Sequence, residues 1–186
     1  MRLYALCDQD MLDKHALTVE EFVQKAQNYN AEIIQYRAKN ANIASMKKEL
    51  IKIRQLYDGF LIVNDAYELV EFCDGVHVGQ EDLYNIDADK KKAVKILRSV
   101  IGSDKILGIS THNEAEVLEA NSMDLNYIGL GAYRDTSTKQ DITTVLGKKL
   151  DDIAKLSEHY VAAIGGVKLD DSFKNVRYHV IGSALL

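Results

Sequence analysis

Short apolar runs rich in β-branched residues alternate with longer amphipathic segments along the whole chain. In the amphipathic segments apolar residues recur at helical spacing, and Thr18 followed by Glu21 marks a capping box. The expected strands are residues 3–7, 32–36, 60–63, 75–78, 105–109, 126–130, 160–164 and 176–181, and the clearest helices are residues 18–29, 43–56, 87–100 and 113–120. This alternation predicts a parallel sheet with crossover helices.

The number of repeats decides between the two main folds of this kind. No linker or break in composition divides the chain, so residues 1–186 are expected to form a single domain. Eight strand–helix repeats favour a closed (β/α)8 TIM barrel over an open doubly wound sheet. Only residues 182–186 follow the last expected strand, so the barrel is expected to be C-terminally shortened, with the eighth helix missing.

Composition and net charge limit which kinds of partner and which location we expect for the protein. The chain has 47% hydrophobic and 27% charged residues, as is typical of a globular protein. Its net charge of -5 argues against nucleic acid, because a phosphate backbone needs a basic face. No stretch approaches the roughly 20 apolar residues of a membrane span, and no signal peptide precedes the first strand, so we expect a cytoplasmic protein. Cys7 and Cys73 are isolated and are expected to be reduced thiols.

Polar residues stand at the expected C-terminal ends of the early strands, where barrels of this class build active sites. Gln35, Arg37 and Lys39 alternate at the end of the second strand, so they are expected to share one face. Asp65 follows the third strand and Asp82 follows the fourth. These two carboxylates are expected to share a hard divalent cation such as Mg²⁺. The early strands therefore predict a cationic, metal-assisted anion site.

Glycines and hydroxyl residues mark the ends of the later strands. Ser110 ends the fifth strand, and Gly131 with residues 136–139 follows the sixth. The pair Gly165 and Gly166 and the pair Gly182 and Ser183 end the last two strands. Barrels of this class commonly bind phosphate there through backbone N–H groups that need glycine for close approach. The later strand ends therefore predict a second anion site, made of backbone N–H donors.

Each of these signals also has a purely structural interpretation. A strand end such as that of Gln35 is typical of a solvated rim, and Asn64 with Asp65 is typical of a turn. His77 lies between two valines and His112 follows Thr111, and such histidines are more often structural than catalytic. The functional interpretation gains weight from the joint placement of these residues on consecutive strand ends.

The order of these motifs resembles the thiamine phosphate synthase family, which also includes related thiazole tautomerases. The resemblance extends from Leu3 to the end of the chain. The motifs that carry it are Gln35-x-Arg37-x-Lys39, Asn64-Asp65, GVHVGQED at residues 75–82, GISTH at residues 108–112, YIGLG at residues 127–131, Thr136-Ser137-Thr138-Lys139, and Ile164-Gly165-Gly166.

The resemblance implies a transferase that couples hydroxymethylpyrimidine diphosphate with hydroxyethylthiazole phosphate to give thiamine phosphate and diphosphate. Diphosphate would leave first, and the thiazole nitrogen would attack the resulting cation. The substrates are small molecules, and neither nucleic acid nor membrane takes part. The family pattern implies Mg²⁺ on Asp65 and Asp82, the pyrimidine diphosphate on Gln35, Arg37, Lys39, Asn64, Ser110 and Lys139, and the thiazole phosphate near Thr136, Thr138, Gly166, Gly182 and Ser183. Among these, Arg37, Lys39, Ser110 and Lys139 are expected to be catalytic, because donors and cations stabilise charge on the leaving diphosphate.

The chain departs from the family pattern in three places. Residues 132–135, Ala-Tyr-Arg-Asp, follow Gly131 where the family has Pro-x-Phe-Pro, so this loop is expected to be more polar and less rigid. Residues 168–175 are shorter than the family's seventh helix, and the eighth helix is missing. A homodimer, or a chain that continues past Leu186, would cover the flank left exposed.

Two alternative functions remain open. A thiazole tautomerase relative carries a catalytic histidine where this chain has Ala132, and lacks the acids that match Asp65 and Asp82. A non-catalytic paralogue that binds thiamine precursors is compatible with the altered loop. The complete set of charged residues favours the synthase over both.

Overall fold

The computed structural model describes residues 2–135 and 145–186. Eight parallel strands form a closed barrel in which sequence neighbours pair around the ring and β8 pairs with β1. The strands are β1 (Arg2–Asp8), β2 (Ile33–Arg37), β3 (Phe60–Asn64), β4 (Gly75–Val78), β5 (Ile106–Thr111), β6 (Tyr127–Leu130), β7 (Tyr160–Ala163) and β8 (Tyr178–Ile181). Each overlaps one predicted run, so the predicted TIM barrel is confirmed.

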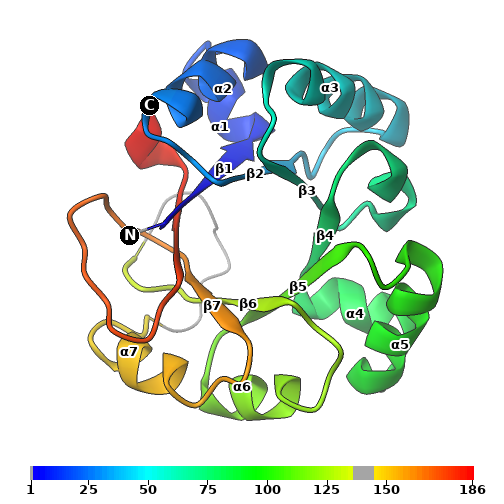
Figure 1. Ribbon diagram of the computed structural model, residues 1–186, viewed down its shortest axis with the longest axis vertical. Helices are drawn as coiled ribbons and strands as arrows, with labels where there is room; N and C mark the ends of the chain where they lie inside the picture. The colour runs from blue at the N-terminus through cyan, green and yellow to red at the C-terminus, as the bar shows by residue number, and fades with distance from the viewer. Residues whose placement is uncertain (1, 136–144) are drawn as a thin grey trace.

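Helices surround the barrel on the outside (Figure 1). They are α1 (Gln9–Lys14), α2 (Val19–Asn28), α3 (Ile43–Leu56), α4 (Gln80–Ile86), α5 (Lys90–Ile101), α6 (Glu114–Ala120) and α7 (Lys149–Ala154), with 3-10 turns η1 (Tyr67–Phe72) and η2 (Ser183–Leu185). The predicted capping box of Thr18 and Glu21 begins α2. No helix among the described residues is long and apolar enough to cross a membrane.

One helix prediction needs correction, and a short helix was not predicted. The helix predicted over residues 87–100 begins later, at Lys90, because the Asp89 side chain accepts hydrogen bonds from the N–H groups of Lys91 and Lys92. The separate helix α4 ends before this predicted range, at Ile86. Helix α1 was not predicted, because its six residues are too few to show a periodic pattern.

The alternation of each strand divides the core into two parts. The outward side chains pack against the helices in one large cluster. The inward side chains form a smaller cluster of Tyr4, Ile33, Ile62, Tyr127, Ala162 and Val180 inside the barrel. Two residues further along β2 and β3 the inward positions are polar, Gln35 and Asn64, whereas on β1 and directly after β7 they are Leu6 and Ile164. The apolar cluster thus forms the floor beneath a polar layer that β2 and β3 begin.

The described residues after β7 contain little helix. Residues 164–177, between β7 and β8, contain no helix, and β8 is followed only by the single turn η2. This turn lies beside α2 (Figure 1), where Lys25 Nζ donates a hydrogen bond of 3.4 Å to the carbonyl of Leu186. Among residues 164–186, η2 is therefore the only helical turn.

Candidate active site

Two half-buried carboxylates face each other beside Gly79, which precedes α4. A Cβ atom added to Gly79 would lie 2.8 Å from Asp82 Oδ2 and 3.9 Å from Asp65 Oδ1. Asp65 follows β3, as predicted, whereas Asp82 lies in the first turn of α4 and not on a strand end. The start of α4 turns the Asp82 side chain back toward Asp65, so the predicted pair forms through a helix.

Electrostatics at this pair match the needs of a divalent cation. Burial, followed by the negative charge of Asp82, raises the pKa of Asp65 to about 6. A backbone hydrogen bond of 3.1 Å from Gly79 to Asp65 Oδ1 opposes this shift only in part. Two carboxylates that repel each other fit a hard cation, which would remove the repulsion and take its other ligands from water and phosphate oxygens. No group of three or more His, Cys, Asp or Glu side chains arranged around a metal position occurs among the described residues.

A chain of hydrogen bonds leads from Asp65 into the barrel. Asn64 Nδ2 donates to Asp65 Oδ2, and Gln35 Nε2 donates to Asn64 Oδ1 at 2.7 Å. The hydroxyl of Tyr4 donates to Gln35 Oε1 at 2.9 Å. The predicted residues Gln35 and Asn64 are therefore oriented by one another and by a tyrosine from the apolar floor.

The same chain continues to the far side of the barrel. The hydroxyls of Tyr4 and Tyr127 are 2.8 Å apart, and Tyr127 Oη lies 2.9 Å from His77 Nδ1. His77 Nε2 in turn lies 3.0 Å from Ser110 Oγ. Side chains from β1 to β6 thus link the carboxylate pair to Ser110. His77 takes the structural role favoured by its flanking valines, and it contacts a predicted catalytic residue as well.

Arg37 is buried beside the same carboxylates. Its guanidinium pairs with Asp8, and its positive charge opposes in part the rise of the Asp65 pKa that burial and Asp82 cause. Asp8 also caps α1 by accepting a hydrogen bond of 3.1 Å from the N–H of Met11. Lys39 does not share the face of Gln35 and Arg37, because β2 ends at Arg37 and Lys39 lies exposed in the following turn. Arg37 is thus fixed inside the site, and Lys39 stands on the rim.

Four residues of this site were missed or left without a role by the sequence patterns. Asp8, Tyr4 and Tyr127 are polar residues in apolar strands, and Gln80 Nε2 donates to the backbone carbonyl of Ser110 at 2.5 Å. A buried tyrosine hydroxyl requires a hydrogen-bond partner. A tyrosine within an otherwise apolar strand, such as Tyr4 or Tyr127, is therefore a sequence signal for a buried polar contact. His112 lies elsewhere, since its Nδ1 pairs with Glu116 Oε2 at 3.0 Å beside the start of α6.

The second anion site was predicted around the glycines that follow β7. Gly165 and Gly166 have φ values of 85° and 68°, which other residues adopt only with strain. Gly182 follows β8, and Ser183 begins η2 with its side chain exposed. Thr136 and Thr138, also predicted for this half, lie outside the described residues, as does Lys139, which was predicted for the pyrimidine diphosphate.

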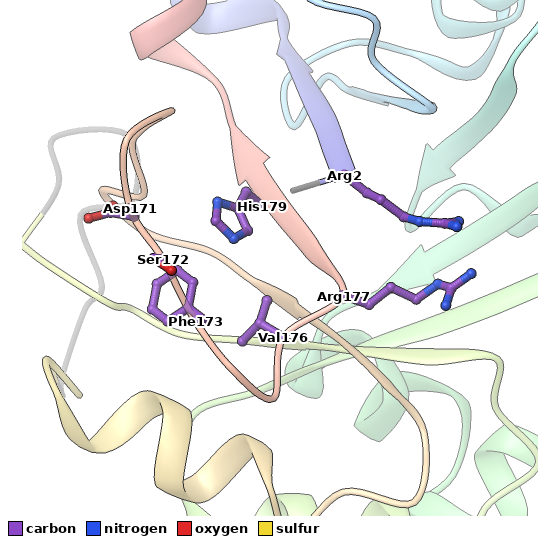
Figure 2. Close-up of a pocket in the computed structure, with 7 residues that line it drawn as sticks. All are labelled: Arg2, Asp171, Ser172, Phe173, Val176, Arg177 and His179. Atoms are coloured by element: carbon purple, nitrogen blue, oxygen red, sulfur yellow. The ribbon is translucent and has the colours of Figure 1, made fainter.

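A cavity of about 320 Å³ lies outside the barrel, between residues 171–177 and β8 (Figure 2). Its wall includes His179, whose neighbours Tyr178 and Val180 face the interior. Arg2 and Arg177 extend away from Phe173 and His179 in Figure 2. Because this cavity opens on the flank and not at the C-terminal ends of the strands, it is separate from the candidate site.

The fold and the site together define a class of protein. A closed parallel barrel with a carboxylate pair, a buried arginine and a positive-φ glycine turn near the C-terminal ends of its strands has the architecture of a TIM-barrel enzyme. Residues 3–186 match the family described as thiamine monophosphate synthase. The chain belongs to this family.

Individual relatives agree with the family match. The chain is 35% identical to the thiamine-phosphate synthase of Persephonella marina over 172 residues, which cover 90% of this chain and 77% of that protein. It is 34% identical to the thiamine-phosphate synthase of Clostridium botulinum, with 89% and 75% covered. Among solved structures, a thiamine phosphate pyrophosphorylase from Pyrococcus furiosus matches with a TM-score of 0.78 and 26% identity, covering 98% of this chain and 86% of that chain.

Proposed function

We propose that this chain is a transferase that joins hydroxymethylpyrimidine diphosphate to hydroxyethylthiazole phosphate, releasing thiamine phosphate and diphosphate. The observation that carries the proposal is the paired carboxylates Asp65 and Asp82, hydrogen-bonded through Asn64 and Gln35 to the polar layer of the barrel. Relatives named as thiamine-phosphate synthases support the same substrates.

The leaving diphosphate is the group that most needs stabilisation. Mg²⁺ held by Asp65 and Asp82 would neutralise charge on it when bound. Arg37, Lys39 and Lys139 add positive charge, and Asn64 and Ser110 supply hydrogen bonds. Because the N–H of Met11 holds Asp8 and Asp8 holds Arg37, the guanidinium needs little reorganisation as charge develops.

The pyrimidine would lie above the floor formed by Tyr4 and Tyr127, with Gln35 and Ser110 at its edges. Gly166, Gly182, Ser183, Thr136 and Thr138 would hold the thiazole phosphate at the other side of the barrel mouth. This layout brings the thiazole nitrogen next to the pyrimidine cation and keeps water away from the cation. No side chain is required as a nucleophile. The cytoplasmic location and the homodimer stay predictions.

An assay of three variants tests the proposal. Purified protein is mixed with both precursors and Mg²⁺, and thiamine phosphate is measured for wild type, Asp65→Asn and Asp82→Asn. Each variant is expected to lose at least about 100-fold in kcat/KM, because one carboxylate alone holds the cation poorly. Asp58→Asn is the matched control, since Asp58 is exposed at the opposite end of β3.

The other outcomes of this assay point to the alternative functions. Isomerisation of the thiazole phosphate without coupling would indicate a tautomerase, although the buried Ala132 stands where that relative has its histidine. Binding of both precursors without product would indicate a non-catalytic binding protein. Either result would overturn the proposed synthase.

A further inference from the structure

The loop after β6 is attached to the segment after β7 by a run of hydrogen bonds. The N–H of Tyr133 donates to the carbonyl of Ile164 at 2.9 Å, and the N–H of Arg134 donates to the carbonyl of Gly165 at 2.8 Å. The guanidinium of Arg134 donates to the next carbonyl, that of Gly166, at 2.7 Å. Three successive carbonyls of the glycine turn therefore point toward residues 133–134.

The direction of these carbonyls fixes the direction of the amides. In a planar trans peptide the C=O and the following N–H point to opposite sides. The N–H groups of Gly165, Gly166 and Val167 must then point away from residues 133–134. Three adjacent N–H groups directed to one side make an anion-binding turn of the kind used for phosphate.

Arg134 is itself held by a second partner. Its two terminal nitrogens each lie 2.6 Å from an oxygen of Asp171, and Asp171 Oδ2 also accepts from the N–H of Lys168 at 2.8 Å. The guanidinium stacks over the ring of Tyr133 at 4.3 Å, and Tyr133 packs edge-on against Phe173 at 5.0 Å. The Asp171 and Phe173 ends of this assembly are seen in Figure 2.

These contacts compensate for the helix that residues 164–177 lack. Without a helix after the glycine turn, no regular backbone hydrogen bonds fix residues 165–167 from the C-terminal side. Arg134 supplies the constraint from the neighbouring loop, and Asp171 anchors Arg134. The loop predicted to be less rigid is thus anchored at residues 133–134, and the polar residue that departs from the family pattern is the anchor.

We propose that Arg134 is a positioning residue for the thiazole phosphate, which holds the Gly165–Gly166 turn so that its N–H groups face the phosphate. This inference rests on the proposed function, because the phosphate is assigned to the turn there. We assign Arg134 a positioning role and not a binding one, because both hydrogens of its Nη1 are taken by Gly166 and Asp171, and Asp171 pairs with its charge.

Steady-state kinetics with each substrate varied in turn tests this role. Wild type, Arg134→Ala, Asp171→Asn and the double variant are compared, after wild type has been shown to form thiamine phosphate. Each single variant is expected to raise KM for the thiazole phosphate about tenfold, as for loss of a charged hydrogen bond, and to leave KM for the pyrimidine diphosphate unchanged. The double variant is expected to have no higher KM for the thiazole phosphate than Arg134→Ala, because both changes remove the same Arg134–Asp171 pair.

Arg177→Ala is the matched control, because Arg177 also stacks on a tyrosine, at 4.1 Å from the Tyr160 ring, but lies before β8 at the opposite end of the barrel. It should leave both KM values unchanged. If Asp171→Asn lowers KM for the thiazole phosphate or leaves it unchanged while Arg134→Ala raises it, Arg134 binds the phosphate directly and the proposal is wrong. Equal increases for both substrates would also overturn it. Absence of product from wild type would instead refute the proposed function.

Discussion

At the scale of single residues, the site depends on polar groups that the barrel buries and pairs. Tyr127 is the clearest case, because its hydroxyl lies between Tyr4 and His77 at 2.8 and 2.9 Å. Burial raises the pKa of Tyr127, so the phenol stays protonated and available as a donor. Through His77 this hydroxyl orients Ser110, which is expected to contact the diphosphate.

Removing this hydroxyl is expected to affect both stability and activity. Tyr127→Phe leaves Tyr4 and His77 each short of one partner, and should lower the free energy of unfolding by about 1–3 kcal/mol in urea titrations. It should also lower kcat severalfold, because His77 no longer orients Ser110. Tyr57→Phe is the control, since the hydroxyl of Tyr57 donates to the carbonyl of Ala31 at 2.7 Å outside the site. Full kcat in Tyr127→Phe would contradict this account.

The carboxylate pair should destabilise the metal-free protein. The pKa of Asp65 rises from 3.8 to about 6, so the folded state holds this proton more tightly than the unfolded state does. This contribution to stability is complete below pH 3.8 and is lost as the pH rises through 6. At pH 7 this stabilising contribution is absent, and the repulsion between Asp65 and Asp82 remains. Metal-free Asp82→Asn should therefore melt at a higher temperature than wild type at pH 7.

Thermal melts with and without Mg²⁺ measure this effect. Removing roughly 1 kcal/mol of repulsion corresponds to a shift of about 2–4 °C for a protein of this size. Mg²⁺ should raise the melting temperature of wild type, through binding to the folded state, and should have little effect on Asp82→Asn. A metal-free Asp82→Asn protein less stable than wild type would show that the carboxylates do not repel.

At the scale of elements, short helices and tight turns at the strand ends position the site. Helix α1 begins where the Asp8 side chain accepts from Met11, so the residue that caps the helix also holds Arg37. Helix α4 brings Asp82 to Asp65. No helix follows the turn at Gly165 and Gly166, so hydrogen bonds from residues 133–134 hold it in place.

A glycine substitution separates backbone strain from crowding in that turn. Gly166→Ala would have both a φ of 68° and a Cβ only 2.8 Å from the Cβ of Arg134. Gly147→Ala is the control, with a φ of 53° and, chain neighbours aside, no atom of the described residues within 4 Å of its added Cβ. Gly147→Ala should cost about 1–2 kcal/mol in urea unfolding from conformation alone, and Gly166→Ala clearly more. Equal costs would mean that the turn can move away from Arg134.

At the scale of the whole molecule, local patterns in the sequence predicted the barrel and where several of its polar residues lie. Eight apolar runs sufficed for the strands, and strand ends placed Gln35, Asn64 and Asp65 correctly, because period-two alternation is a local property. The contact of Tyr4 with Tyr127 joins positions 123 residues apart, and no spacing rule connects them. The pairing of Arg134 with Asp171 is also long-range, so the sequence showed only a polar loop.

The strand-end site as a whole is tested most directly by the stoichiometry of the wild-type reaction. Purified protein is incubated with pyrimidine diphosphate, thiazole phosphate and Mg²⁺, and thiamine phosphate and free diphosphate are measured in the same samples. The account predicts equal amounts of both products, and neither of them when EDTA removes the metal. Diphosphate release without thiamine phosphate, or product formation that is insensitive to EDTA, would contradict it.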